Sequence, residues 1–570
     1  MIGLVAVTAA GRANADRLAA AWPGRTRRYD GPASTALPAA FGQCDSVVAF
    51  LATGAAVRLL APVLVDKAHD AGVVCVDEAA TFAVALLGGH AGGANALAHD
   101  VATVLGAQPV VTTATDAAGV PGLDALGLPC EGDIAGVSRA LLDGEPVRLE
   151  ADQPWPLPAF PTNVSAAAPP GAPRILLTDR LRPDGDGGSA GPSAVLRPPS
   201  LVLGVGASRG APAEELRALA EQAFADAGLS PRSVREVVSA DVKADEPAIR
   251  ELASTLAVPF RTFPAGDLAT QPVPNPSAVV EAAVGTPSVA EAAVLATGAD
   301  LVLPKRVGRT VTVAIGRFPP RGRLALIGLG PGARDLLTPR AVRELRRAAV
   351  VVGLDQYVDQ VRDLLRPGAE ILASGLGAEE ERARTAVARA QAGRAVALVG
   401  SGDAGIYAMA SPTLETLDDA LRAGGPPIDV IGVPGITAAL AASAALGAPL
   451  GHDHTYISLS DLHTPWDVIE HRLRAAAEAD VAVALYNPRS RARSDHLAKA
   501  LAILAAHRPP TTPVGLVRDA SRPGERGVVT TLADVDPQRV DMLTVVIVGS
   551  SATRLVDGRM VTPRGYRWLS

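Results

Sequence analysis

The chain has few aromatic residues and few cysteines for its length of 570 residues. Phenylalanine, tryptophan and tyrosine make up 3% of it, although hydrophobic residues make up 48%. The core must therefore be built from alanine, valine and leucine, which is typical of parallel α/β sheets covered on both faces. Cys44, Cys75 and Cys130 are an odd number without metal-type spacing, so we predict reduced thiols, no metal site and a cytoplasmic location.

Signals for nucleic acid and membranes are also missing. The formal net charge is −6 and the pI about 5.9, so no overall basic surface favours nucleic acid. The longest uncharged run, 430–451, is mostly alanine and glycine and is interrupted by Pro434 and Pro449, which argues against a membrane span. No charge precedes the apolar run at 1–10, which predicts a first strand rather than a signal peptide.

Short apolar runs alternate with helical patterns along most of the chain, which predicts several parallel or mixed-sheet α/β domains. In the first part we predict strands over 2–8, 46–51, 72–76 and 109–112, and helices over 14–21 and 94–105. From residue 201 we predict strands over 201–205, 234–239, 301–304 and 310–315, and helices over 213–227, 246–256 and 288–296.

The sequence between these parts changes in composition. Eleven of the 47 prolines fall within 151–200, and only 174–180 has the pattern of a strand. A proline-rich segment of this kind predicts a partly flexible connection around a small residual subdomain. We therefore expect four parts: an α/β domain at 1–130, a degraded, proline-rich segment at 131–200, a second α/β domain at 201–318, and a C-terminal α/β module at 323–570.

In the C-terminal module, apolar runs end in loops of small residues. The first run, 324–332, carries three glycines within five residues, in the spacing G-x-G-P-G rather than the dinucleotide fingerprint G-x-G-x-x-G. Ligands of open parallel sheets bind beyond the carboxyl ends of the strands. The loops therefore predict a cleft for a nucleoside-like ligand with few charges, and an ordinary strand-to-helix turn is the alternative for the first loop alone.

Six segments carry a resemblance to a known family: GLGPG (328–332), SGDAGIYAMA (401–410), VPGITAA (433–439), LSDLHTPW (459–466), YNPRSRAR (486–493) and TVVIVGSS (544–551). They resemble the tetrapyrrole methylases, and most of all the precorrin-3B C(17)-methyltransferase branch. The resemblance implies a two-lobed α/β module, usually a homodimer, that binds S-adenosylmethionine and a precorrin-type tetrapyrrole. It implies these cofactor-binding residues: Gly328, Gly330, Pro331, Gly332, Gly402, Asp403, Ile406, Tyr407, Thr437, Ala438, Tyr486, Asn487 and Thr531.

Methylation at C(17) in this branch is accompanied by contraction of the macrocycle to precorrin-4, which requires proton movement. Residues 451–463 contain three histidines and two aspartates, and histidine titrates near neutral pH. We predict His452, Asp453 and Asp461 as catalytic residues. A polar surface loop that merely caps a helix is the alternative. Thr437 is expected to cap the helix that follows it.

The N-terminal half resembles a second family. GGHAGGAN (88–95), TTATD (112–116), GVGASRG (204–210), SADVKADE (239–246) and GTPSVAE (285–291) look like the cobalamin biosynthesis protein G family, known as cobalt-precorrin-5A hydrolase. The resemblance implies opening of a δ-lactone with release of a two-carbon fragment, with His90, Lys243 and Glu246 as candidates. Two alternatives stay open: the N-terminal half is a non-catalytic tetrapyrrole-binding module, or the methylase acts on another ring carbon.

Overall fold

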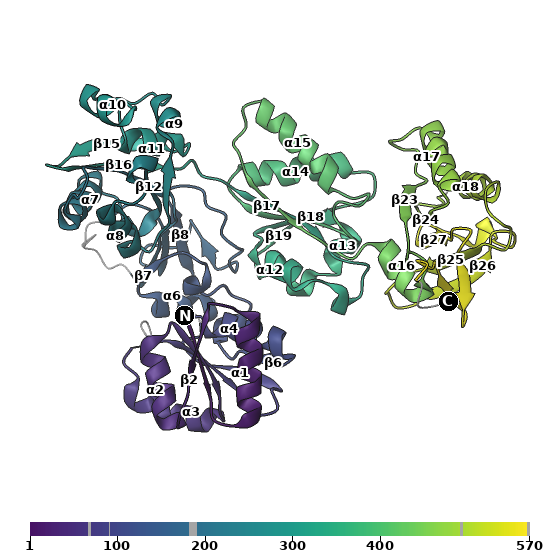
Figure 1. The fold of residues 1–570 in the computed structure, drawn as a ribbon, viewed down its shortest axis with the longest axis horizontal. Coiled ribbons are helices and arrows are strands. Elements are labelled where there is room, and N and C mark those ends of the chain that lie inside the picture. The colour runs from purple at the N-terminus through teal and green to yellow at the C-terminus, as the bar shows by residue number, and fades with distance from the viewer. Residues whose placement is uncertain (67–69, 90–91, 182–190, 491–493, 567–570) are drawn as a thin grey trace. The chain divides into compact units, whose positions relative to one another are not determined.

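The computed structural model describes residues 1–66, 70–89, 92–181, 191–490 and 494–566. The chain divides into two compact units, which we describe separately (Figure 1). The first comprises 1–154, 160–320 and 366–368, and the second comprises 155–159, 321–365 and 369–570. Within the described ranges, no helix is both long and apolar enough to cross a membrane.

The first sheet has the order β2-β1-β3-β4-β5-β6. Its strands are β1 (Ile2–Ala6), β2 (Thr26–Tyr29), β3 (Ser46–Phe50), β4 (Gly72–Val76), β5 (Phe82–Leu87) and β6 (Gln108–Val110). Its helices are α1 (Ala9–Ala21), α2 (Ala33–Gln43), α3 (Thr53–Leu60) and α4 (Ala94–Leu105). One buried cluster joins α1 and α4 to the sheet and another joins α2 and α3, so both faces are covered.

The central segment is more ordered than the sequence predicts, and the expectation of a single strand at 174–180 is wrong. Its sheet has the order β7-β11-β10-β8-β9. The elements are β7 (Cys130–Gly132), α6 (Ile134–Leu142), β8 (Val147–Ala151), β9 (Val164–Ser165), β10 (Arg174–Leu177) and β11 (Ser193–Leu196). Pro146, Pro173 and Pro192 directly precede β8, β10 and β11, a position in which proline removes no ladder hydrogen bond.

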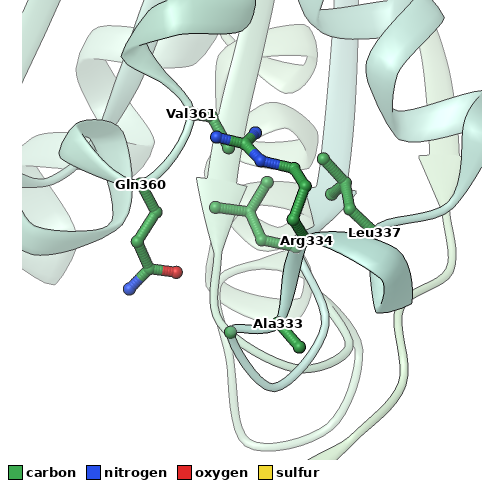
Figure 2. A pocket seen from close by; sticks show the side chains of 7 residues that line it. Ala333, Arg334, Leu337, Gln360 and Val361 are labelled. Atoms are coloured by element: carbon green, nitrogen blue, oxygen red, sulfur yellow. The ribbon is translucent and has the colours of Figure 1, made fainter. Parts of the chain in front are cut away.

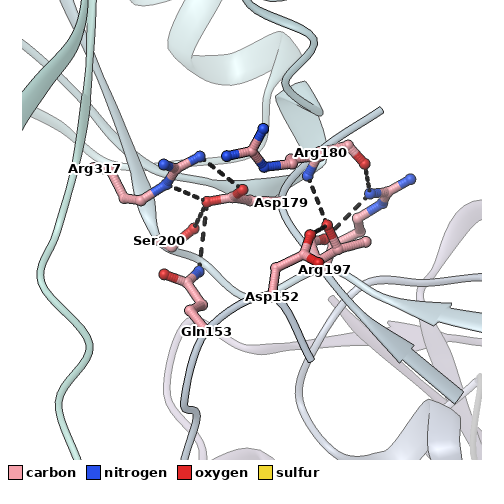
Figure 3. A network of polar contacts seen from close by, with 8 residues as sticks. Asp152, Gln153, Asp179, Arg180, Arg197, Ser200 and Arg317 are labelled. Carbon is pink, nitrogen blue, oxygen red and sulfur yellow. Dashed lines mark hydrogen bonds and ion pairs between the residues drawn. The ribbon is translucent and has the colours of Figure 1, made fainter. Parts of the chain in front are cut away.

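A buried ion pair ties this segment to the domain that follows it (Figure 3). Asp179, just beyond β10, accepts hydrogen bonds from Arg317 Nε at 2.7 Å and Nη2 at 2.9 Å. Ser200 Oγ donates to the same carboxylate at 2.7 Å. Only 3% of the Asp179 side chain is exposed, and its charge is stabilised by these three donors. The central segment is therefore an integral part of the first unit.

The third sheet agrees with its predicted strands and has the order β14-β13-β12-β16-β15. Its strands are β12 (Leu201–Ala207), β13 (Val234–Ala240), β14 (Phe260–Phe263), β15 (Asp300–Val307) and β16 (Val311–Arg317). Helices α7 (Ala213–Ala227) and α8 (Pro247–Thr255) cover one face, and α11 (Ala290–Ala296) covers the other.

The second unit contains the two lobes implied by the sequence. The first lobe is a parallel sheet in the order β19-β18-β20-β17-β21. It consists of β17 (Arg323–Gly328), β18 (Val350–Leu354), β19 (Glu370–Ser374), β20 (Ala395–Gly400) and β21 (Asp429–Val433). Helices α14 (Glu379–Gln391) and α15 (Ala410–Arg422) cover one face and α12 (Pro339–Arg347) the other, as Figure 1 shows.

The second lobe is a mixed sheet in the order β23-β24-β27-β25-β26. Its elements are α16 (Ala438–Leu446), β23 (His454–Ser458), α17 (Trp466–Glu478), β24 (Ala482–Tyr486), α18 (His496–Ala505), β25 (Pro513–Arg518), β26 (Arg526–Thr531) and β27 (Thr544–Val548). Strands β23 and β24 are parallel to each other, whereas β27 is antiparallel to both β24 and β25. The predicted fold class, several α/β domains with a two-lobed C-terminal module, is confirmed.

Candidate functional site

Three glycine-containing loops meet at the carboxyl ends of β17, β20 and β21. Gly330 and Gly402 exchange two backbone hydrogen bonds, with N···O distances of 3.0 and 2.7 Å. A Cβ on Gly435 would lie 2.0 Å from the Gly402 oxygen, and one on Gly328 would lie 2.6 Å from the same oxygen. Glycine is required here because only bare backbone fits between the loops.

Asp403 fastens two of these loops together. Its Oδ1 accepts a hydrogen bond from Gly405 N at 2.8 Å, and its Oδ2 accepts one from Gly435 N at 3.0 Å. The Ile406 amide also bonds to the Asp403 carbonyl at 3.3 Å. The carboxylate of Asp403, predicted to bind the cofactor, therefore holds the loop after β20 against the loop after β21.

Tyr486 joins the end of β24 to the start of α16. Its hydroxyl lies 2.6 Å from Thr437 Oγ1 and accepts a hydrogen bond from the Ala439 amide at 2.9 Å. Thr437 stands at the N-cap position, but its side chain makes no capping hydrogen bond. The expectation that Thr437 caps the helix is therefore wrong, because the phenol of Tyr486 takes that place. The neighbouring Ala438 is the first residue of α16.

Three tyrosines form an aromatic cluster between the lobes of the second unit. The ring centroid of Tyr486 lies 5.3 Å from that of Tyr407 and 5.8 Å from that of Tyr456. Tyr407 Oη donates a hydrogen bond to the Tyr456 carbonyl at 2.7 Å. The Tyr407 backbone has a φ of 51°, a left-handed conformation that is rare for a residue other than glycine. Burial raises the pKa of all three phenols. They stay neutral at physiological pH, and the strained backbone of Tyr407 marks a candidate functional position.

A second polar group lies at the carboxyl ends of β23 and β24. Asn487 Nδ2 donates to Ser458 Oγ at 3.1 Å. Nearby on the same edge, Asp461 Oδ2 lies 3.7 Å from Nε2 of the buried His496, whose Nδ1 is 3.0 Å from the Leu459 carbonyl oxygen. His496 is not among the residues predicted from the sequence, where its one signal is its place three residues after the YNPRSRAR segment.

The His496 ring is held from its other side by an aromatic residue. It stacks on Trp466 with a centroid distance of 4.4 Å. This stacking fixes the plane of the imidazole, so its Nε2 stays directed at Asp461.

His452 and Asp453 do not lie beside Asp461, so the three predicted catalytic residues do not form one group. Both are exposed, and the Asp453 carbonyl accepts from the Ala482 amide at the amino ends of β23 and β24. The five residues of β23 separate them from Asp461, and five strand residues span about 17 Å. Closeness in sequence does not bring these side chains together here, because the chain between them is an extended strand.

Thr531, another predicted cofactor-binding residue, lies on the strand that packs against α16 through Val529. It ends β26 and donates to Asp534 Oδ2 at 2.6 Å within a local turn. In the hairpin it pairs with Pro513, whereas the residues at the opposite end of the hairpin, Arg518 and Arg526, pair next to the turn at 519–525. Thr531 stays a prediction as a cofactor-binding residue.

A small hollow borders the first glycine loop (Figure 2). Leu329, Gly332, Ala333, Arg334, Leu337, Gln360 and Val361 line it. Arg334 is paired with Asp363 at 2.7 Å, so the hollow offers no strong free charge to a ligand. Gly328, Gly330 and Pro331 are buried, whereas Gly332 is half-buried.

In the first unit, the glycine segment at 88–95 contacts the threonine segment at 112–116. Asn95 Nδ2 donates to Thr113 Oγ1 at 3.1 Å, and the Asn95 amide bonds to the Gly89 carbonyl at 2.9 Å. These bonds fix the start of α4 beside the end of β6. The predicted catalytic residue His90 lies outside the described residues.

Two further predicted segments, 204–210 and 239–246, meet at the carboxyl ends of β12 and β13. Buried Glu246 accepts a hydrogen bond from the Gly210 amide at 2.9 Å through Oε1. Ser239 Oγ donates to the Val205 carbonyl at 2.7 Å. The Lys243 carbonyl accepts from the Glu246 amide at 3.1 Å, and the Lys243 side chain is half-buried. This edge is where an open α/β sheet binds ligands.

Comparison with known proteins assigns families to these regions. Residues 323–536 match the family described as Tetrapyrrole (Corrin/Porphyrin) Methylases. Residues 201–316 match Cobalamin synthesis G C-terminus, and residues 35–116 match Cobalamin synthesis G N-terminal. Both families expected from the sequence are confirmed.

Individual relatives match the C-terminal module. It is 46% identical over 243 residues to a Probable cobalt-factor III C(17)-methyltransferase of Salmonella typhimurium, covering 43% of this chain and 99% of that protein. It is 42% identical over 254 residues to a Precorrin-3B C(17)-methyltransferase of Sinorhizobium sp, and the match covers 44% of this chain and 99% of that protein. The crystal structure of the methyltransferase CobJ has 41% identity, covers 42% of this chain and 98% of its own, and gives a TM-score of 0.40. The chain therefore belongs to the tetrapyrrole methylase family and carries the N- and C-terminal domains of cobalamin synthesis G ahead of the methylase module.

Proposed function

We propose that residues 323–570 transfer a methyl group from S-adenosylmethionine to C(17) of a precorrin-3B- or cobalt-factor III-type macrocycle, with contraction of the ring to the precorrin-4 level. The names of the two relatives described above, which the chain covers almost completely, support this substrate and position. The observation that carries the proposal is the junction of the three glycine loops, which offers backbone and uncharged groups at one sheet edge. Such an edge suits a nucleoside-like donor.

The residues at this edge fit the donor. A Cβ built on Gly400 would meet no atom within 4 Å, so open space borders the end of β20 beside the packed loops. We assign the donor to Gly402, Ile406, Tyr407 and the start of α16. When bound, S-adenosylmethionine supplies an activated methyl group, which leaves sulfur as the bond to C(17) forms and a neutral thioether remains. The chain contributes mainly by holding the methyl group and the ring carbon close and aligned.

We place the proton movement of ring contraction on Asp461. It is the one predicted catalytic residue of the module that lies at the carboxyl edge of β23, and 41% of its side chain is exposed to a substrate. The buried His496, whose Nε2 lies 3.7 Å from Asp461 Oδ2, orients the carboxylate of Asp461. A carboxylate supported by an imidazole can accept and return a proton. His452 and Asp453 lie at the opposite edge of the sheet, so we do not assign them this role.

The assay of this function uses the full chain with S-adenosylmethionine carrying a carbon-13 methyl group. Precorrin-3B and cobalt-factor III are supplied in separate reactions, and the products are read by mass and by carbon NMR. We expect one added methyl group on C(17) with at least one of the two rings. A methyl group on another ring carbon would support the alternative methylase, and absence of any methylated product from both rings would refute the proposal.

We further propose that the N-terminal half opens the lactone of the ring-contracted product. The meeting of the Gly210 and Glu246 turns at one sheet edge supports a binding site there, and the same edge also suits a non-catalytic tetrapyrrole-binding module. The variants Lys243→Ala and Glu246→Gln discriminate between the two. Loss of lactone opening with ring binding intact supports the hydrolase, and unchanged turnover of the lactone supports the binding module.

We also propose that the protein is a cytoplasmic homodimer associated through the methylase module. Leu555 and Val556 on β28 (Arg554–Val556) and the loop residues Met542 and Leu543 are 46–52% exposed. Exposed apolar side chains on one module favour association. Sedimentation velocity of the full chain tests this, and a monomer at micromolar concentration would refute it.

A further inference from the structure

The turn between β25 and β26 carries an arginine that reaches two glycine loops of the other lobe. Arg522 Nε donates to the Pro331 carbonyl at 2.8 Å, and its Nη2 donates to Ser401 Oγ at 3.3 Å. Pro331 follows β17 and Ser401 follows β20, so one side chain of the second lobe contacts both loops of the first. No other part of the predicted donor site has this bridging arrangement among the hydrogen bonds of the described residues.

The third glycine of the GLGPG loop makes room for this arginine. A Cβ on Gly332 would lie 2.7 Å from both Cγ and Nε of Arg522, closer than real Cβ contacts. Gly332 also has a φ of 135°, a conformation that other residues rarely adopt. The glycine is therefore explained by the close approach of Arg522.

The turn that presents Arg522 is itself well fixed. The Arg522 amide donates to the Asp519 carbonyl at 2.9 Å, and the Ser521 amide donates to Glu525 Oε2 at 2.6 Å. Asp519 and Ser521 both have positive φ values, 53° and 59°. A turn with this many internal constraints holds its arginine in place, so little conformational entropy is lost when the guanidinium binds the loops.

We propose that Arg522 is a positioning residue that latches the second lobe onto the two glycine loops and thereby holds the methyl-donor site in its binding geometry. This inference rests on the proposed function of the module. The Gly330–Gly402 backbone bonds join the loops, so the guanidinium fixes both at once. Arginine suits this task because its planar group reaches two acceptors in fixed directions, which the single ammonium of lysine does not.

The test compares four variants of the full chain: Arg522→Ala, Arg522→Lys, Ser401→Ala and the control Arg526→Ala. Arg526 lies on the same hairpin and is exposed. Amide hydrogen exchange is followed in peptides covering 328–334 and 400–405, and binding of S-adenosylhomocysteine is measured by calorimetry. We expect Arg522→Ala to speed exchange in both peptides and weaken binding by about tenfold, the scale of a lost charged hydrogen bond.

The other variants give a graded expectation. Arg522→Lys and Ser401→Ala should lie between wild type and Arg522→Ala, and Arg526→Ala should match wild type. In turnover assays the latch variants should raise the KM for S-adenosylmethionine more than they lower kcat. If amide exchange in both peptides and S-adenosylhomocysteine binding are unchanged in Arg522→Ala, the proposed positioning role of Arg522 is refuted. If wild type itself binds no S-adenosylhomocysteine, the proposed function fails, and the exchange measurement alone then decides whether the latch exists.

Discussion

The hydroxyl of Tyr486 gives the sharpest test of how the donor site is built. Replacing Tyr486 with phenylalanine keeps the ring beside Tyr407 and Tyr456 but removes the oxygen that contacts Thr437 and the Ala439 amide. Two hydrogen bonds are lost, and the first turn of α16 loses its cap. The change is confined to one atom, so any effect reports on those bonds.

The size of the effect follows from the two contacts. A hydrogen bond contributes about 1 kcal/mol net, and an N-terminal cap is worth a similar amount. Losing both bonds should lower the free energy of local opening at α16 by about 2 kcal/mol, which corresponds to about 30-fold faster exchange of its protected amides. Thr437 is buried, so water cannot fully replace the missing partner.

Hydrogen exchange of peptides from 436–446 measures this opening directly, and calorimetry with S-adenosylhomocysteine measures its consequence for binding. We expect weaker binding by about tenfold, because part of the donor site is the start of this helix. Tyr456→Phe is the matched control, since Tyr456 contributes its backbone carbonyl to the bond with Tyr407. Equal exchange in Tyr486→Phe, Tyr456→Phe and wild type would refute the reasoning.

Three further predictions concern other parts of the chain. Gly435→Ala places a Cβ 2.0 Å from the Gly402 oxygen, so we expect S-adenosylhomocysteine binding to be lost in calorimetry; retained affinity would contradict the packing of the loops. Arg317→Ala leaves the buried carboxylate of Asp179 without its main partner, which should destabilise the first unit by about 3 kcal/mol in calorimetric unfolding; an unchanged transition would contradict this. Burial raises the pKa of the Cys75 thiol from 9.0 to about 12, so iodoacetamide at pH 8 should leave it unmodified in the native chain, as peptide mass can show. Because the native state holds this proton longer than the unfolded state, Cys75 should lower stability progressively as pH rises from 9.0 to about 12.

Most strands of 201–318 and the first strand of the methylase module were predictable because their signal is local. A run such as 324–328 is apolar throughout, as expected for a parallel strand covered on both faces. β2 escaped prediction because its sequence, TRRY, lies on the sheet edge and is largely polar. The strands β8 and β11 escaped because prolines stand next to them, although a proline just before a strand breaks no ladder bond.

The amino-acid sequence by itself determined the family of each part, the glycine loops and the residue types that surround them. Tertiary structure decided which of those residues meet. Tyr486 and Thr437 are 49 residues apart and share a hydrogen bond, whereas Asp453 and Asp461 are close in sequence and lie at opposite ends of β23. The physical reason is that an extended strand carries neighbours apart, while parallel sheet topology gathers the ends of distant strands at one edge.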